Sequence, residues 1–203
     1  MAVYTEVSDT EITEFVASYD VGPLLSFRGI AEGVENSNYL LHTGTGPLIL
    51  TLYEKRVDEA DLPFFLGLMH HLAARGVTCP TPLEDQQGNT LKRLAGRPAA
   101  LISFLEGMWV RRPGPDHCAE LGAALARMHL EAQDFELKRE NALAPNGWRP
   151  LFEASKDGAN TVVPRLEKEI ERELALLDQN RPDKSPAGLT TPILFQDKSL
   201  FLG

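Results

Sequence analysis

Short apolar runs separated by glycine, asparagine and proline stand near the start of the chain. Residues 24–30, 37–43 and 47–53 each combine apolar side chains with a strand-like length. The Gly-Thr-Gly connection at 44–46 is short enough for a tight hairpin turn, whereas the connection at 31–36 is longer and contains a glycine. The pattern predicts an antiparallel meander of three strands.

The next segment has helical spacing. Apolar residues recur three and four positions apart between Leu62 and Ala73, which favours a helix. Asp58 is the expected N-terminal cap of this helix, and Gly76 is its expected end. The apolar run at 98–105 then predicts a further buried strand.

The second half of the chain is mainly helical in its spacing. Apolar residues share one helix face at 116–132 and again at 163–179, so two helices are predicted there. The intervening stretch at 134–160 is rich in asparagine, proline and glycine, and we expect it to be irregular, with Trp148 and Phe152 as anchors. Strands followed by helices indicate an α+β architecture of two lobes, with a hinge after the last strand.

Composition narrows the class of protein. The chain has 203 residues, and none of its apolar runs reaches the roughly 18 to 20 residues that cross a bilayer. The N-terminus lacks the basic and apolar segments of a signal peptide, so we expect a cytoplasmic protein with no membrane partner. With 29 acidic against 20 basic residues, the net charge of −9 argues against nucleic acid as a partner. Cys79 and Cys118 match no paired metal spacing and are expected to be reduced and buried.

The connection between the first two predicted strands could bind phosphate. Gly29 and Gly33 would let backbone N–H groups approach a phosphate closely, although a plain turn needs such residues as well. On the third predicted strand, the period of two places Thr51 and Lys55 on one face. A lysine there could reach nucleotide phosphates, and the alternative is a solvated lysine at a strand end.

Four motifs together carry a resemblance to a known family. They are Glu-Asn-Ser-Asn-Tyr at 35–39, Tyr-Glu-Lys-Arg at 53–56, Leu-Gly-x-x-Leu-Ala-x-x-His at 121–129 and Trp-Arg-Pro-Leu-Phe-Glu at 148–153. Through these motifs nearly the whole chain resembles the homoserine kinases of the aminoglycoside phosphotransferase and choline kinase-like superfamily. The helix motif at 121–129 is shared across that superfamily, and the other three are more specific.

The resemblance implies a protein kinase-like, two-lobed fold. Residues 1–105 would be the β-rich nucleotide-binding lobe, and residues 106–203 would be part of a helical lobe that ends at the catalytic loop region. The implied reaction is the ATP- and Mg²⁺-dependent phosphorylation of the L-homoserine hydroxyl to O-phosphohomoserine in threonine biosynthesis. ATP and L-homoserine would be the partners, and the oligomeric state is not implied. The implied nucleotide-binding residues are Gly29, Gly33, Asn38, Thr51, Lys55, Ser103, Phe104 and Leu105.

The chain departs from the family at the catalytic loop. That loop reads His-x-Asp-x-x-x-x-Asn, in which the Asp accepts the proton of the attacking hydroxyl and the Asn holds Mg²⁺. Here Thr191 takes the position of the His, Ile193 that of the Asp and Lys198 that of the Asn. Isoleucine accepts no proton and a lysine cation opposes Mg²⁺, so no catalytic or metal residue is intact. The family also has a lysine on the third strand where this chain has Thr51, and a second metal-binding Asp beyond the position of Gly203.

Three interpretations of the altered loop stay open. The first is a homoserine kinase sequence in which two frameshifts compensate each other. If the codon of Thr190 ends in C, Thr191 is ACG, Pro192 is CCG and the codon of Ile193 begins with AT, reading one base earlier gives CAC GCC GAT, which encodes His-Ala-Asp. The second is an inactive, pseudokinase-like fragment that binds nucleotide or a partner. The third is a related small-molecule kinase of the choline or aminoglycoside type.

Overall fold

The computed structural model describes residues 5–31, 35–54, 58–141, 144–180, 188–189 and 200–201. The chain divides into two compact units. The first comprises Met1–Leu137 with Leu189–Gly203, and the second comprises Lys138–Gly188. None of the helices in the described ranges is long and apolar enough to span a membrane.

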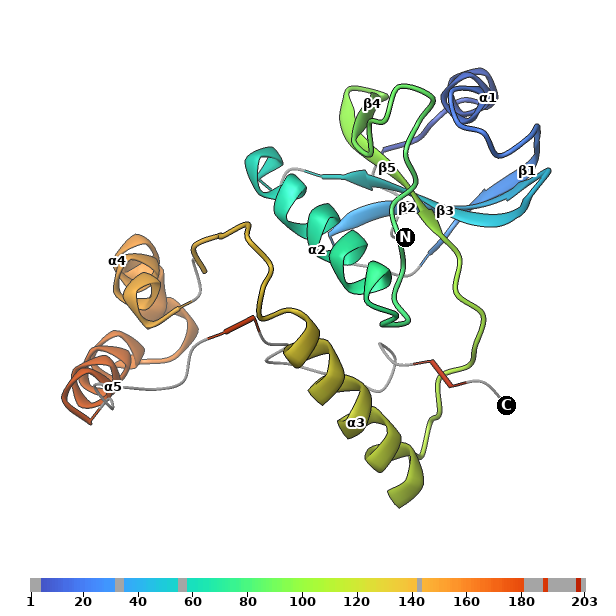
Figure 1. The fold of residues 1–203 in the computed structure, drawn as a ribbon. Coiled ribbons are helices and arrows are strands. Elements are labelled where there is room, and N and C mark those ends of the chain that lie inside the picture. The colour runs from blue at the N-terminus through green and yellow to red at the C-terminus, as the bar shows by residue number, and fades with distance from the viewer. Residues whose placement is uncertain are drawn as a thin grey trace. The chain divides into compact units, whose positions relative to one another are not determined.

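An antiparallel five-stranded sheet forms the centre of the first unit (Figure 1). Its strand order is β1-β2-β3-β5-β4, so the first three strands form the predicted meander. The strands are β1 (Leu24–Gly29), β2 (Asn36–Thr43), β3 (Gly46–Tyr53), β4 (Lys92–Leu94) and β5 (Arg97–Ser103). Gly46 has a φ of +128°, a conformation that favours glycine, at the tight turn between β2 and β3.

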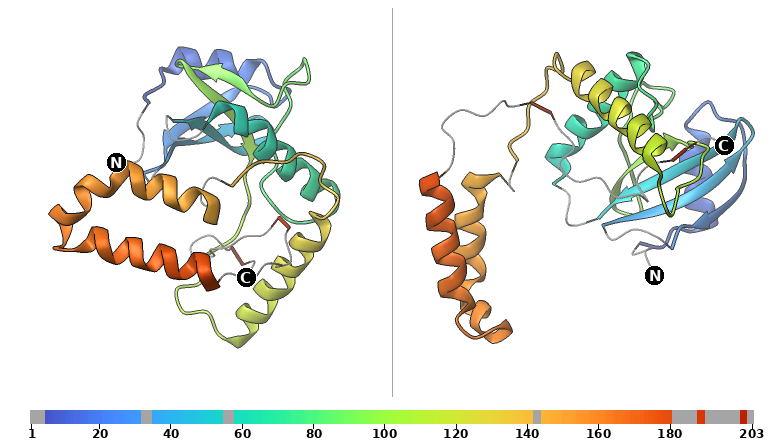
Figure 2. Two further views of the ribbon diagram at one scale, coloured as in Figure 1. Left: turned by 90° about the vertical axis from the view of Figure 1, so that its left-hand side faces the viewer. Right: turned by 90° about the horizontal axis from the view of Figure 1, so that it is seen from below.

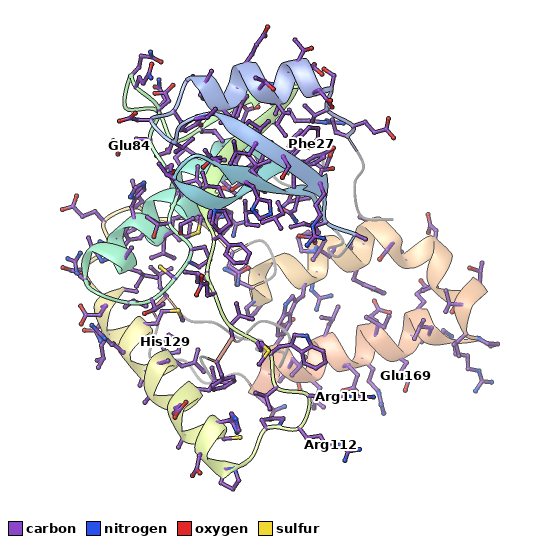
Figure 3. All side chains as sticks on the ribbon, turned by 90° about the vertical axis from the view of Figure 1, so that its right-hand side faces the viewer. Phe27, Glu84, Arg111, Arg112, His129 and Glu169 are labelled. Atoms are coloured by element: carbon purple, nitrogen blue, oxygen red, sulfur yellow. The ribbon has the colours of Figure 1, made fainter. Side chains whose placement is uncertain are left out.

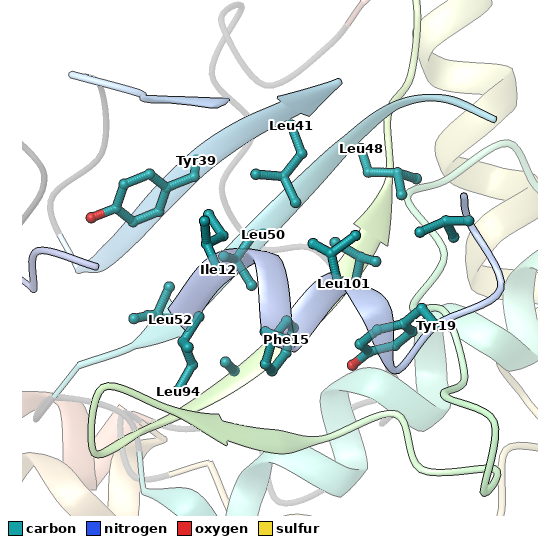
Figure 4. Packing of buried hydrophobic residues seen from close by; sticks show 13 residues of the cluster. Ile12, Phe15, Tyr19, Tyr39, Leu41, Leu48, Leu50, Leu52, Leu94 and Leu101 are labelled. Carbon is teal, nitrogen blue, oxygen red and sulfur yellow. The ribbon is translucent and has the colours of Figure 1, made fainter. Parts of the chain in front are cut away.

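Helix α1 (Asp9–Ala17) packs on one face of this sheet, and the sequence analysis missed it. Ile12, Phe15 and Val16 form one cluster with inward residues of the strands, including Leu41 and Leu50 (Figure 4). The sequence does carry signals for the helix: the Ser8 hydroxyl caps the N–H of Glu11, the Glu11 carboxylate accepts from the N–H of Ser8, and apolar residues follow at helical spacing.

A buried ionic contact fixes the end of α1 to β4. The Asp85 carboxylate accepts hydrogen bonds from the backbone N–H groups of Gln87 and Asn89, and it pairs with Lys92 Nζ at 3.2 Å. Lys92 Nζ also donates to the hydroxyl of Ser18 at 2.6 Å. The hydrogen bonds, first of all that from the Asn89 backbone N–H, lower the pKa of Asp85 from 3.8 to about 2.

Helix α2 (Leu62–Ala74) packs on the opposite face, preceded by a short 3₁₀ turn, η1 (Glu59–Asp61). Leu66 contacts Ala100 and Ile102 of β5, with Ile49 and Tyr53 of β3 packed around them. The predicted helix is therefore confirmed. Asp58 caps η1 by accepting from the N–H of Ala60 at 3.0 Å, and Gly76, at a φ of +74°, follows the end of α2.

Helix α3 (Pro115–Glu131) confirms the helix predicted at 116–132, and its C-terminal end is tied to α2. Arg75 pairs with Asp134, and His71 Nε2 lies 2.9 Å from the carbonyl oxygen of Glu131. Because Arg75 can only donate, its 3.1 Å contact makes His71 Nδ1 an acceptor and leaves the ring proton on Nε2. The predicted lobe boundary at 105/106 stays a prediction.

The expected burial of the two cysteines is wrong for one of them. Cys118 is exposed on α3, and Cys79 is half-buried after α2. Burial raises the pKa of the Cys79 thiol. Both thiols are free, as expected.

The second unit contains a pair of helices, α4 (Pro145–Val162) and α5 (Leu166–Asn180) (Figure 2). Arg149 pairs with Asp178 at 2.9 Å between them. Helix α5 confirms the prediction at 163–179, whereas α4 replaces most of the irregular stretch predicted at 134–160. Of the two expected anchors, Phe152 is buried and Trp148 is 38% exposed.

Candidate nucleotide-binding site

Three of the predicted site residues meet at one end of the sheet. Gly29 is the last residue of β1 and lies opposite Tyr39 of β2, and the next residue, Ile30, donates its N–H to the carbonyl of Asn38 at 2.8 Å. Asn38 lies opposite Thr51 of β3, whose hydroxyl donates to Asn38 Oδ1 at 2.9 Å. The start of the β1–β2 connection, Asn38 and Thr51 are therefore neighbours across three strands. Gly33 and Lys55 lie outside the described residues.

The end of β3 carries no free charge among the described residues. Thr51 is 7% exposed and its hydroxyl is already donated to Asn38. Glu54 accepts from the hydroxyl of Ser37 at 2.8 Å and pairs with Arg97 at 3.1 Å. Burial raises the pKa of Tyr53 to about 12, so its phenol is neutral at physiological pH. Thr51, which the resemblance predicts to take the position of a family lysine, is thus a buried, neutral hydroxyl.

The predicted hinge follows β5. Ser103 donates its N–H to the carbonyl of Thr81 at 2.9 Å, and its hydroxyl accepts from the N–H of Thr81 at 2.9 Å. Phe104 is 39% exposed and Leu105 is half-buried. Within the described part of the chain, the backbone of 104–106 makes no backbone hydrogen bond. Its N–H and C=O groups can therefore pair with the edge of a nucleobase.

A two-residue bridge pairs the segment after the hinge with the end of the described chain. Met108 N donates to the carbonyl of Phe201 at 3.0 Å, and Phe201 N donates to that of Met108 at 2.9 Å. The ring of His117 meets the Phe201 ring edge-on, with centroids 4.9 Å apart. Gly107 permits the approach, because a Cβ there would stand 2.8 Å from Leu200 Cβ. The sequence analysis missed this bridge, and the only local signal was a glycine next to an apolar pair.

The predicted catalytic loop residues Thr191, Ile193 and Lys198 lie outside the described residues. Their side-chain types nevertheless bear on metal binding. The carboxylate and amide oxygens that Mg²⁺ prefers are absent from Ile193 and Lys198. These two positions do not fit the metal that the family implies. Among the described residues, no three His, Cys, Asp or Glu side chains are grouped as a metal site.

The sheet, the interposed helix α2 and the hinge define a kinase-like phosphotransferase fold, which solved structures share. The GDP and kanamycin complex of APH(2")-IIia matches 85% of this chain and 58% of its own, with a TM-score of 0.58 and 19% identity. Spectinomycin phosphotransferase in complex with ADP and spectinomycin matches 87% of this chain and 60% of its own, with a TM-score of 0.55 and 11% identity. The predicted α+β, kinase-like fold with an incomplete helical lobe is confirmed.

Residues 26–190 match the model of the phosphotransferase enzyme family, and the chain belongs to that family. All 203 residues align with proteins named homoserine kinase: 55% identical in Parvibaculum lavamentivorans, 57% in Chelativorans sp. and 58% in Rhizobium etli. The predicted resemblance to homoserine kinases is confirmed. The chain spans 63% of the length of each of these relatives. The family match ends at Thr190, and the predicted loop positions Thr191, Ile193 and Lys198 follow it.

Proposed function

We propose that this chain is the nucleotide-binding portion of a homoserine kinase. The observation that carries the proposal is the identity of 55–58% with proteins of that name over all 203 residues. In the whole enzyme, the γ-phosphoryl group of ATP would pass to the hydroxyl of L-homoserine, giving O-phosphohomoserine and ADP in threonine biosynthesis. The cytoplasmic location stays a prediction.

Nucleotide binding is assigned to the hinge and to the β1–β2 end of the sheet. Phe104 and Leu105 would pair the nucleobase through their unbonded backbone groups, and Gly29 and Asn38 would lie beside the phosphates. Two features support this assignment: the hinge backbone makes no other backbone hydrogen bond in the described chain, and fold neighbours were solved with ADP and GDP. The roles of Gly33, Thr51, Lys55 and Ser103 stay predictions.

Phosphoryl transfer requires a proton acceptor, and the position that the family gives to it holds Ile193 in this chain. A side chain positioned for proton transfer contributes roughly 10² to 10⁴ in rate, and Ile193 supplies none. We therefore expect the chain as written to bind nucleotide without turnover. This is also the second candidate function, a nucleotide-holding, pseudokinase-like protein, and the altered loop is the observation that favours it.

The experiment measures binding and turnover separately. Thermal melting with ADP, ATP or adenosine reports binding, and a coupled assay with ATP and L-homoserine reports turnover, with choline and kanamycin as alternative acceptors. We expect stabilisation by nucleotide without turnover. Turnover of L-homoserine near that of a full-length relative would contradict the inactive reading. No stabilisation by any nucleotide would contradict the nucleotide-binding assignment.

The origin of the altered loop is tested at the level of DNA. Resequencing codons 189–199 should reveal a displaced frame that encodes His-Ala-Asp across residues 191–193. A confirmed Thr-Thr-Pro-Ile frame would refute the frameshift hypothesis. In that case, the triple variant Thr191→His, Ile193→Asp, Lys198→Asn is made in this chain, extended by the C-terminal part of a relative, and asks whether the loop alone prevents transfer.

A further inference from the structure

The face of the sheet that holds α2 is only partly covered. The α2 contacts on this face come from β3 and β5, through Ile49, Tyr53, Ala100 and Ile102. Over β1 and β2, the residues that point to the same face are half-buried or exposed. They are Ser26, Arg28, Asn36, Asn38, Leu40 and His42. Among the described residues, this face is therefore partly open beside α2, on the first two strands.

Arg28 belongs to this open area by strand alternation. Its neighbour Phe27, labelled in Figure 3, lies on the sheet. The Phe27 ring packs with Tyr39 on the face that α1 covers, with ring centroids 6.2 Å apart. Because successive side chains on a strand point to opposite faces, Arg28 points to the face of α2. It lies opposite Leu40 and directly precedes Gly29, where the β1–β2 connection begins.

Arg28 also differs from the other lysine and arginine residues of the five strands. Those three are each paired with a carboxylate: Lys92 with Asp85 at 3.2 Å, Arg93 with Glu59 at 2.6 Å and Arg97 with Glu54 at 3.1 Å. Arg28 is exposed and has no ion pair with a described residue. In a chain with a net charge of −9, an unpaired guanidinium on an open sheet face attracts an anion.

We propose that Arg28 binds the phosphates of the nucleotide at the base of the β1–β2 connection. This proposal rests on the proposed function and deepens it. It assigns to β1 the positive charge that the buried, neutral Thr51 cannot supply from β3. The planar guanidinium can donate two hydrogen bonds to one phosphate, and Asn38 on the same face supplies a further polar group.

The test compares ligands with and without phosphates. Arg28→Met keeps most of the apolar stem and removes the charge, Arg28→Lys retains a charge without the planar fork, and Arg172→Met removes the same charge from α5. Calorimetric titrations of the full chain use adenosine, ADP, ATP and inorganic tripolyphosphate. We expect Arg28→Met to weaken binding of ADP, ATP and tripolyphosphate about tenfold to a hundredfold, with adenosine unchanged. The affinity of Arg28→Lys for these three ligands should lie between those of the parent and Arg28→Met, and the affinity of Arg172→Met should equal that of the parent.

Other outcomes separate this proposal from the proposed function. Equal ATP affinity in the parent and Arg28→Met would overturn the role of Arg28 while leaving nucleotide binding in place. An equal loss for adenosine and ATP would overturn it too, because it would indicate a general structural defect. If the parent binds tripolyphosphate through Arg28 but binds neither ADP nor ATP, the phosphate site stands and the nucleotide function fails. If the parent binds none of the four ligands, both are refuted.

Discussion

Replacing Gly107 by alanine tests whether the bridge between Met108 and Phe201 depends on close backbone approach. Gly107 has a φ of +146°, which a residue with a Cβ adopts at a cost of about 1–3 kcal/mol. The new Cβ would also stand 2.8 Å from Leu200 Cβ, whereas ordinary contact begins at 3.4 Å. Either the backbone strains or the two segments separate by more than half an ångström.

Separation relieves the collision as well as the backbone strain, so we expect the two segments to separate. It breaks the two hydrogen bonds of the bridge, at 3.0 and 2.9 Å, each worth about 0.5–1.5 kcal/mol. The bridge should therefore weaken by about 1–3 kcal/mol, which is roughly a 5- to 150-fold shift toward the open state. Gly96→Ala is the matched control, because Gly96 has a φ of +74° but nothing within 4 Å of a Cβ. That variant carries backbone strain without the collision.

Amide hydrogen exchange measures the effect directly. Protection of the Met108 and Phe201 amides should fall in Gly107→Ala by the factor above, while amides in β2 and β3 keep theirs. Gly96→Ala should leave both bridge amides unchanged. Unaltered protection of Phe201 in Gly107→Ala would refute the reasoning, because the bridge would then tolerate the side chain that its geometry excludes.

Three further variants test the core, a helix cap and an ionic contact. Leu50→Ala removes a fully buried side chain at the centre of the sheet and should lower the free energy of unfolding by about 3–5 kcal/mol in urea titrations, and a loss below 1 kcal/mol would contradict its central position. Ser8→Ala should cost about 1 kcal/mol in the same assay, because Glu11 loses its capping partner, and Ser8→Asn should restore most of it. The pKa of Asp85 lies at about 2 instead of 3.8, so its contribution to stability is complete above pH 4 and disappears as the pH falls toward 2. Parent and Asp85→Asn should therefore differ in urea midpoint at pH 6 and converge near pH 2, and a constant difference would argue against linkage to this carboxylate.

The strands were predictable because their signals are local. The runs at 24–30, 37–43 and 47–53 agree within one residue with β1, β2 and β3. Glycine and proline mark the turns between them, and burial follows the pleat. The register follows from the tight turn between β2 and β3, which places Thr43 opposite Gly46.

The helices α1 and α4 were missed for different physical reasons. Helix α1 has a capping box at Ser8 and apolar residues at helical spacing, so attention to the cap would have found it. Helix α4 contains Pro150 and Gly147, which are poor helix formers on their own. Burial of Phe152 and contacts with the neighbouring helix α5 stabilise α4 despite those residues. Local propensity alone does not predict these tertiary contacts.

The strand residues of the candidate site could be predicted from the sequence, but its long-range contacts could not. Asn38 and Thr51 follow from the meander, since a fixed register makes them neighbours. The pairing of Met108 with Phe201 joins positions far apart in the sequence, and no local pattern encodes it. The sequence does not distinguish Arg28 from the other lysine and arginine residues of the strands. Ion pairing distinguishes them, and it depends on the folded structure.

The proposed binding and transfer functions would depend on separate parts of the chain. Among the described residues, the main core cluster draws on positions between Ile12 and Leu101, with Val7 packed against it, and includes no residue of the helical second half of the chain. Among the described contacts, the bridge at Phe201 is the link between the hinge segment and the chain that follows the loop. The prediction that Thr191, Ile193 and Lys198 replace a proton acceptor and a metal ligand therefore concerns no residue of this described core cluster. A chain of this kind should keep its fold and its affinity for nucleotide when it has lost transfer, which is why binding and turnover must be measured separately.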